Sequence, residues 1–150
     1  MAGGAPRFVR PAAMERLLNR LFGALIGAGI GLPHHFVLEV RGRKSSRLYS
    51  TPIDVTTLGS RRYLVAPRGE TQWVRNARSR GEVALRRGSR RETVALRELA
   101  DAEKPEVLKA YLDAYKTTVQ RFFPVPAGSP PDAFRPLCAD YPAFELLSRR

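Results

Sequence analysis

The apolar positions of this sequence fall into short alternating runs and longer segments of helical period. Phe36, Leu38 and Val40 alternate with their neighbours over residues 36–41, and further short apolar runs follow along the chain, at 48–58, 62–66, 83–86 and 92–99. Runs of this length bounded by glycine or basic turns are typical of β-strands. Short connections at Gly59 and Gly88 predict two antiparallel hairpins, which together suggest a meander. Pro52 indicates that the second strand lies at an edge or carries a bulge.

Helical segments separate and follow these strands. Residues 71–80 predict a short helix that Gly81 ends. A longer helix is expected from Asp101 as N-cap, with Pro105 in its first turn. Its apolar stripe consists of Val107, Leu108, Tyr111, Leu112 and Tyr115. Phe122 to Pro126 should interrupt it, a short helix is expected to open at residues 130–134, and the chain closes on Tyr141 to Phe144.

The N-terminal segment has a different character. Residues 1–13 are small and proline-containing, and we expect them to be mobile. Residues 14–32 predict an amphipathic helix whose apolar run is shorter than the ~20 residues that span a bilayer. The helix either packs on the domain or makes a peripheral membrane contact. The whole chain of 150 residues is expected to form one domain, cytoplasmic or membrane-associated, as a monomer or homodimer.

The charge of the chain is strongly unbalanced. Lys and Arg number 26 against 14 Asp and Glu, a formal net charge of +12. Such a field favours a polyanionic ligand, an anionic membrane or nucleic acid. Aromatic and basic residues are not interleaved into a platform, so no nucleic-acid partner is predicted. Cys138, His34 and His35 are too few for a metal site, and Cys138 is expected to be buried.

Two segments carry candidate anion-binding chemistry. In the first, Arg43, Lys44 and Arg47 crowd beside Ser45 and neighbouring hydroxyls in a turn that follows Gly42. Fixed positive charge with hydroxyl and N–H donors suits phosphate or carboxylate oxygens, although such a turn can also be only a solvated loop. In the second, residues 67–70 lead from a strand into the N-terminus of the helix at 71–80, where free N–H groups favour anions.

Trp73 and Asn76 lie three residues apart on that helix, so they are expected to share a face. The alternative is that Trp73 anchors the core and Asn76 is a polar residue at the helix end. No Ser–His–acid set, carboxylate pair, Walker A loop or GxGxxG motif is present, and no catalytic residue is assigned. The chemistry is therefore expected to belong to a bound cofactor.

Three ordered pieces resemble the deazaflavin-dependent nitroreductase and quinone reductase family of actinobacteria. They are Gly42-Arg-Lys-Ser with Thr51-Pro52, then Tyr63-Leu-Val-Ala-Pro-Arg-Gly69, then Trp73-Val-Arg-Asn76. The resemblance implies a mainly β (α+β) fold, a split β-barrel of antiparallel strands related to the FMN-binding barrels, with flanking helices and an N-terminal helix. It also implies coenzyme F-420, whose phosphate and oligoglutamate tail are anionic, with FMN as the alternative cofactor.

The resemblance further implies hydride transfer to a small-molecule acceptor, either a quinone, a nitro compound or an activated double bond. The residues that it places against the cofactor are Arg43, Lys44, Ser45, Tyr49, Thr51, Pro52, Val65, Ala66, Pro67, Arg68, Gly69, Trp73 and Asn76. Arg43 and Lys44 would meet the tail, Thr51 and Pro52 the deazaflavin, residues 65–69 the ring or phosphate, and Trp73 and Asn76 the tail groove.

The chain departs from the family pattern at a few positions. Ser46 replaces a glycine, Tyr49 an arginine, Arg68 a lysine, and Glu70 a glycine whose loss adds negative charge near the anion site. Tyr111 and Tyr115 do not align with certainty to the family's acceptor-site tyrosines, so the acceptor stays open. The competing hypothesis is a non-catalytic split-barrel protein that binds a lipid, fatty acid or haem.

Overall fold

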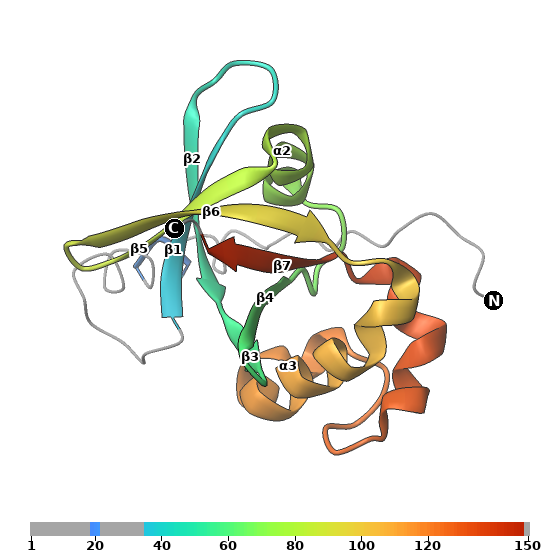
Figure 1. The fold of residues 1–150 in the computed structure, drawn as a ribbon. Helices are drawn as coiled ribbons and strands as arrows, with labels where there is room; N and C mark the ends of the chain where they lie inside the picture. The colour runs from blue at the N-terminus through green and yellow to red at the C-terminus, as the bar shows by residue number, and fades with distance from the viewer. Residues whose placement is uncertain (1–18, 22–34, 149–150) are drawn as a thin grey trace.

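The computed structural model describes residues 19–21 and 35–148, and Figure 1 shows their arrangement. Its centre is one antiparallel sheet of 7 strands in the order β2-β1-β5-β6-β7-β4-β3. The strands are β1 (His35–Arg41), β2 (Leu48–Asp54), β3 (Thr56–Leu58), β4 (Arg61–Val65), β5 (Glu82–Arg87), β6 (Arg90–Glu98) and β7 (Ala143–Ser148). The helices are α2 (Gln72–Arg80), α3 (Lys104–Val119) and the 3-10 segments η1 (Asp101–Glu103), η2 (Gln120–Phe122) and η3 (Pro131–Asp140).

The strands expected at 36–41, 62–66, 83–86 and 92–99 are confirmed, and the run at 48–58 is corrected. It forms two strands, because β2 pairs with β1 while β3 pairs with β4 at the other end of the sheet order. Val55, 5% exposed, is the buried junction between them. The edge position inferred from Pro52 is confirmed, since β2 is an outermost strand.

The expected meander is wrong because β7 enters the middle of the sheet. β7 pairs with β6 on one side and with β4 on the other. The sequence pattern at Tyr141 to Phe144 predicts no strand. The short run Ala143–Ser148 contains Glu145, which weakens its apolar pattern, but Arg97 donates hydrogen bonds to the Glu145 carboxylate in the sheet.

Successive residues of β4 and β7 serve two different cores, as alternation in a strand requires. Tyr63 and Val65 face a core that β4 shares with α3, η3 and Tyr141. Leu64, with Phe144 of β7, faces the second core inside the curled sheet. In Figure 1, α2 lies beside the β1–β2 hairpin, whereas α3 lies by β3 and β4.

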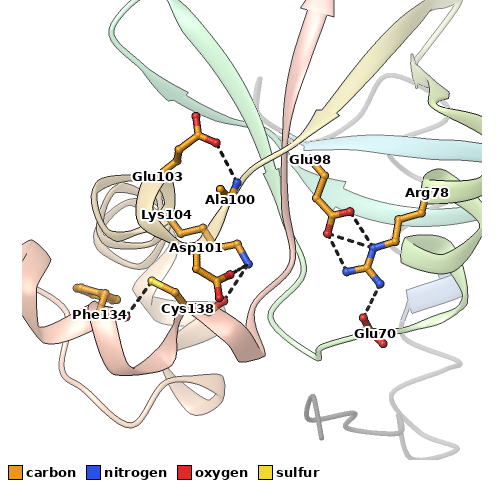
Figure 2. A network of polar contacts seen from close by, with 9 residues as sticks. All are labelled: Glu70, Arg78, Glu98, Ala100, Asp101, Glu103, Lys104, Phe134 and Cys138. Carbon is orange, nitrogen blue, oxygen red and sulfur yellow. Dashed lines mark hydrogen bonds and ion pairs between the residues drawn. The ribbon is translucent and has the colours of Figure 1, made fainter. Parts of the chain in front are cut away.

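The helices expected at residues 71–80 and after Asp101 are confirmed, but the second begins later than predicted. Gly81 adopts φ 73° after α2 and donates its N–H to Ala77 O, as expected of a glycine that ends a helix. Asp101 is not the N-cap of α3. It opens η1, and its carboxylate accepts a hydrogen bond from the buried Lys104 Nζ at 2.9 Å (Figure 2). Cys138 is buried, as predicted.

Most of the expected N-terminal helix, and all of residues 1–13, lie outside the described residues. Residues 19–21 are helical, and the amphipathic helix expected over 14–32 stays a prediction. None of the helices that the structure describes is long and apolar enough to cross a membrane.

Candidate functional site

The turn between β1 and β2 is closed by its own backbone. Gly42 donates its N–H to Arg47 O at 2.7 Å, and Ser46 takes the left-handed conformation with φ 59°. Ser45 Oγ accepts a hydrogen bond from Arg47 N at 3.3 Å. The ring of Tyr49 packs over Gly42, where an added Cβ would lie 2.9 Å from Tyr49 Cε2. Gly42 therefore serves to let the aromatic ring lie against the turn.

A polar stripe on α2 binds this turn. Gln72, Asn76 and Arg80 are spaced four residues apart, so they share one helix face. Arg43 donates its backbone N–H to Asn76 Oδ1 at 3.0 Å, and its Nη1 donates to Asn76 Oδ1 and to Gln72 Oε1, each at 2.9 Å. Arg80 Nη2 donates to Gly42 O at 2.6 Å. Asn76 is 3% exposed and is therefore not a surface amide; its hydrogen bonds to Arg43 attach the turn to α2.

Several cationic side chains gather in and beside the turn. Among the residues that the structure describes, none of them pairs with a carboxylate; they are Arg41, Arg43, Lys44, Arg47 and Arg80. Their partners are neutral oxygens, as in the bonds from Arg41 Nη1 to Ser46 O at 3.1 Å and from Arg80 Nη2 to Ser46 Oγ at 3.1 Å. Other arginines are ion-paired, among them Arg62, Arg78, Arg86 and Arg97. The turn is therefore a concentrated positive region.

Thr51 and Pro52 point to opposite faces of β2. Thr51 is opposite Leu38, a residue of the inner core, whereas Pro52 is opposite Val37. Cross-strand partners share a face and adjacent residues alternate, so only Thr51 lies on the inner side, where the Leu38 core also receives α2. The contact of both residues with the cofactor ring stays a prediction, and in this fold their side chains would approach the ring from opposite faces of β2.

The loop after β4 begins buried and ends at α2. Val65 and Ala66 are 1% exposed, and Ala66 donates its N–H to Pro142 O at 2.8 Å. Gly69 has φ 87°, a conformation that favours glycine, and donates to Ala66 O at 3.2 Å. Thr71 Oγ1 is buried without a hydrogen-bond partner among the described residues, at the residue that precedes the first N–H groups of α2.

Two charged side chains of this loop have partners of their own. The Arg68 guanidinium lies 4.7 Å from the centroid of Phe122, which belongs to η2. The Glu70 carboxylate accepts a hydrogen bond from Arg78, which also binds Glu98, as Figure 2 shows. Arg78 of α2 thus compensates the negative charge that Glu70 brings to this loop.

Trp73 lies between the core and the surface. Its ring centroid is 5.8 Å from that of Phe144 in β7, and the side chain is half-buried against the inner core. Although Trp73 and Asn76 are close on the helix, they contact different neighbours, because Asn76 faces Arg43. The placement of Trp73 agrees with a core anchor that still has one exposed part.

The tyrosines of α3 lie at the junction of β2 and β3. Tyr115 donates its hydroxyl hydrogen to Val55 O at 2.6 Å, and its ring is 5.6 Å from that of Tyr111. Burial, and then the charge of Asp54, raise the pKa of both phenols, so both are neutral at physiological pH. The junction is therefore a place where aromatic rings and neutral hydroxyls meet.

A polar cavity of about 610 Å³ adjoins the basic turn. Its lining includes Arg41, Ser46 and Arg80 from the turn network, and Glu39 and Arg91 from the outer face of the sheet. Burial by itself would raise the pKa of Glu39, but hydrogen bonds from Arg91 and Arg86 outweigh it and hold that pKa below its ordinary value of 4.5. Glu39 is therefore ionised, and Arg86 and Arg91 compensate its negative charge beside the cavity.

The structure brings most of the expected residues together, and it adds some. Arg43 is hydrogen-bonded to Asn76, Tyr49 packs over the same turn, and the loop 65–69 leads into the start of α2. Sequence reasoning missed Gln72, Arg80 and the pairing of Glu70 with Arg78. The spacing of four residues from Gln72 to Asn76 to Arg80 was the signal that could have found the polar stripe.

Comparisons with known proteins agree on family and fold. A family model described as F420H(2)-dependent quinone reductase matches residues 14–125. No curated protein matches the chain significantly.

Among solved structures, an F420-H2 dependent reductase has 16% identity and TM-score 0.52, covering 76% of this chain and 94% of its own. A domain-swapped dimer has 19% identity and TM-score 0.54, covering 89% and 92%. A heme binding protein from Mycobacterium smegmatis has 15% identity and TM-score 0.51, covering 92% and 52%. At these identities the likeness concerns the fold alone, and it confirms the split β-barrel.

Proposed function

We propose, on the premise that this chain belongs to the F420H(2)-dependent quinone reductase family, that its basic turn and α2 hold the anionic part of coenzyme F-420. The protein is a deazaflavin-dependent oxidoreductase whose cofactor is coenzyme F-420 and whose acceptor is of the quinone type.

The observation that carries the proposal is the set of cations at the turn. Arg43 and Lys44 were expected to meet the cofactor tail, and Arg41, Arg47 and Arg80 surround them without a carboxylate partner among the described residues. Leaving several like charges close together is unfavourable unless a ligand or counterions compensate them. The phosphate and glutamate carboxylates of the cofactor would supply that compensation.

The residues around the turn would preorganise this anion site. Asn76 and Gln72 fix the Arg43 guanidinium, which leaves its remaining N–H groups to an anion. Arg80 fixes the path of the turn through Gly42 O. We further propose that Lys44, which makes no hydrogen bond or ion pair within the described part of the chain, closes over the bound tail.

The cofactor ring would lie against the loop 65–69 and the Thr51 side of β2. Gly69 keeps that loop close to the start of α2, and the buried Thr71 Oγ1 is a polar atom that a ligand could satisfy. When bound, the reduced deazaflavin supplies the hydride. The protein would orient the ring and exclude water. Tyr115, which is partly exposed and packs against the buried Tyr111, would offer a neutral phenol to an uncharged acceptor.

Further details of the acceptor and of cellular location are proposals. Nitro compounds and activated double bonds remain candidate acceptors beside quinones, because a hydride acceptor needs only an electrophilic π-system within reach of the ring. A peripheral membrane contact through residues 14–32 would bring the protein to membrane-borne quinones. A non-catalytic role in binding a lipid, fatty acid or haem is not favoured, since the family is one of reductases.

Fluorescence titration with coenzyme F-420 tests the proposal. Lys44→Ala should weaken binding about tenfold at low salt, with a smaller effect at high salt, because an exposed charge pair is screened. Arg135→Ala is the matched control, since Arg135 is a 63% exposed side chain that pairs with Asp132 of the same η3 segment. If both variants bind the cofactor equally, or if the unaltered protein does not bind it at low salt, the proposal is wrong.

A further inference from the structure

Arg78 connects three parts of the chain around the loop that precedes α2. It is a residue of α2 that donates from Nε to Glu98 Oε1 at 2.9 Å and to Oε2 at 3.1 Å, and from Nη2 to Oε2 at 2.7 Å. Its Nη1 donates to Glu70. Glu98 ends β6 and Glu70 ends the loop, and Figure 2 shows the guanidinium between the two carboxylates.

The environment makes this contact stronger than an ordinary surface ion pair. The side chains of Arg78, Glu70 and Glu98 are 34%, 29% and 35% exposed, so water screens them only in part. The bonds to Glu98 are bidentate, which fixes the plane of the guanidinium and so the position of Nη1. Arg78 thus offers Glu70 a partner that is already oriented.

An unpaired carboxylate at Glu70 would weaken the binding of an anion near the start of α2. It is two residues before Gln72, whose Oε1 binds Arg43 at 2.9 Å, and it immediately precedes Thr71 at the N-terminus of α2. An anionic ligand at this place would be repelled by a free carboxylate and attracted by the N–H groups of the helix.

We infer that Arg78 is a positioning residue of the cofactor site, which anchors the loop 66–70 to α2 and β6 and cancels the charge of Glu70 beside the bound anion. This inference rests on the proposed function. The alternative is that Arg78 only stabilises the fold, in which case its removal lowers stability and leaves the electrostatics of cofactor binding unchanged.

Paired variants separate these two roles. Arg78→Gln should weaken coenzyme F-420 binding about fivefold at low salt, and the defect should shrink at high salt. Adding Glu70→Gln should restore the affinity to within about twofold of the unaltered protein, because it removes the harmful charge. Adding Glu98→Gln instead should not restore it, since Glu98 is on the far side of Arg78 from the loop. Melting temperatures of all three report any loss of stability.

The outcomes differ for the inference and for the proposed function. If the unaltered protein binds the cofactor but Arg78→Gln binds it equally well, the inference alone fails. It also fails if neither second substitution restores affinity, or if both do so equally, because then charge at Glu70 is not the cause. If the unaltered protein does not bind coenzyme F-420 at all, the proposed function fails, and the inference with it.

Discussion

Substitution of Asn76 separates the shape of the basic turn from its charge. Asn76 Oδ1 accepts from the backbone N–H and from Nη1 of Arg43, at 3.0 and 2.9 Å, and Asn76 is only 3% exposed. Asn76→Ala removes both bonds and leaves a partly buried N–H unpaired, which costs about 1–3 kcal/mol, while the charge-assisted bond contributes about another 1.5 kcal/mol. We expect a loss of roughly 3 kcal/mol of unfolding free energy, or about 6–12 °C in melting temperature for a domain of this size.

Asn76→Asp is the matched control for this change. The carboxylate keeps an acceptor for both bonds, so we expect the melting temperature to stay within a few degrees of the unaltered value. It also neutralises the Arg43 charge, and coenzyme F-420 should bind about tenfold more weakly at low salt, which corresponds to about 1.4 kcal/mol. Thermal unfolding and fluorescence titration measure the two effects. The reasoning is refuted if Asn76→Ala unfolds like the unaltered protein, or if Asn76→Asp binds the cofactor with unchanged affinity.

Two further predictions concern the sheet and the core. The pKa of Glu39 is held low in the folded state by Arg91 and Arg86, so its stabilising contribution is present above the unfolded-state pKa and is lost as the pH falls through the folded-state pKa, below 4.5. Between neutral and acid pH, the free energy of unfolding in urea should therefore fall less for Glu39→Gln than for the unaltered protein. An equal fall would contradict this role of Glu39. Phe134 is 0% exposed and lies 6.1 Å, centroid to centroid, from Phe123. Phe134→Ala should cost about 3–5 kcal/mol in urea unfolding and Phe134→Leu clearly less, whereas equal losses would show that the cavity is not the cause.

Much of the local structure could be read from the sequence because it depends on local periodicity. Alternation located the strands before residue 100, and Gly81 marked the end of α2 because a left-handed residue is needed there. Pro52 placed β2 at an edge, since a missing N–H is tolerated only where no partner strand needs it. The same kind of reasoning found the basic turn and the helix that faces it.

The order of strands could not be read in this way. Nothing local in Ala143–Ser148 says that it pairs with β4 and β6, because that pairing depends on the burial of both of its faces and on Arg97 reaching Glu145. The division of residues 48–58 into two strands has the same cause. Each half follows a different partner, and the partner is chosen by tertiary packing.

For the site, the sequence by itself determined which chemistry is concentrated in it: the arginines and lysine after the first strand, the glycine turns and the helix that follows. Only the tertiary structure decided which of these charges remain available. It pairs Glu70 with Arg78, turns Arg68 toward Phe122 and leaves the cations around Arg43 without carboxylate partners among the described residues. The physical reason is that residue type fixes a charge, while its compensation depends on neighbours that are distant in sequence and meet only when the chain has folded.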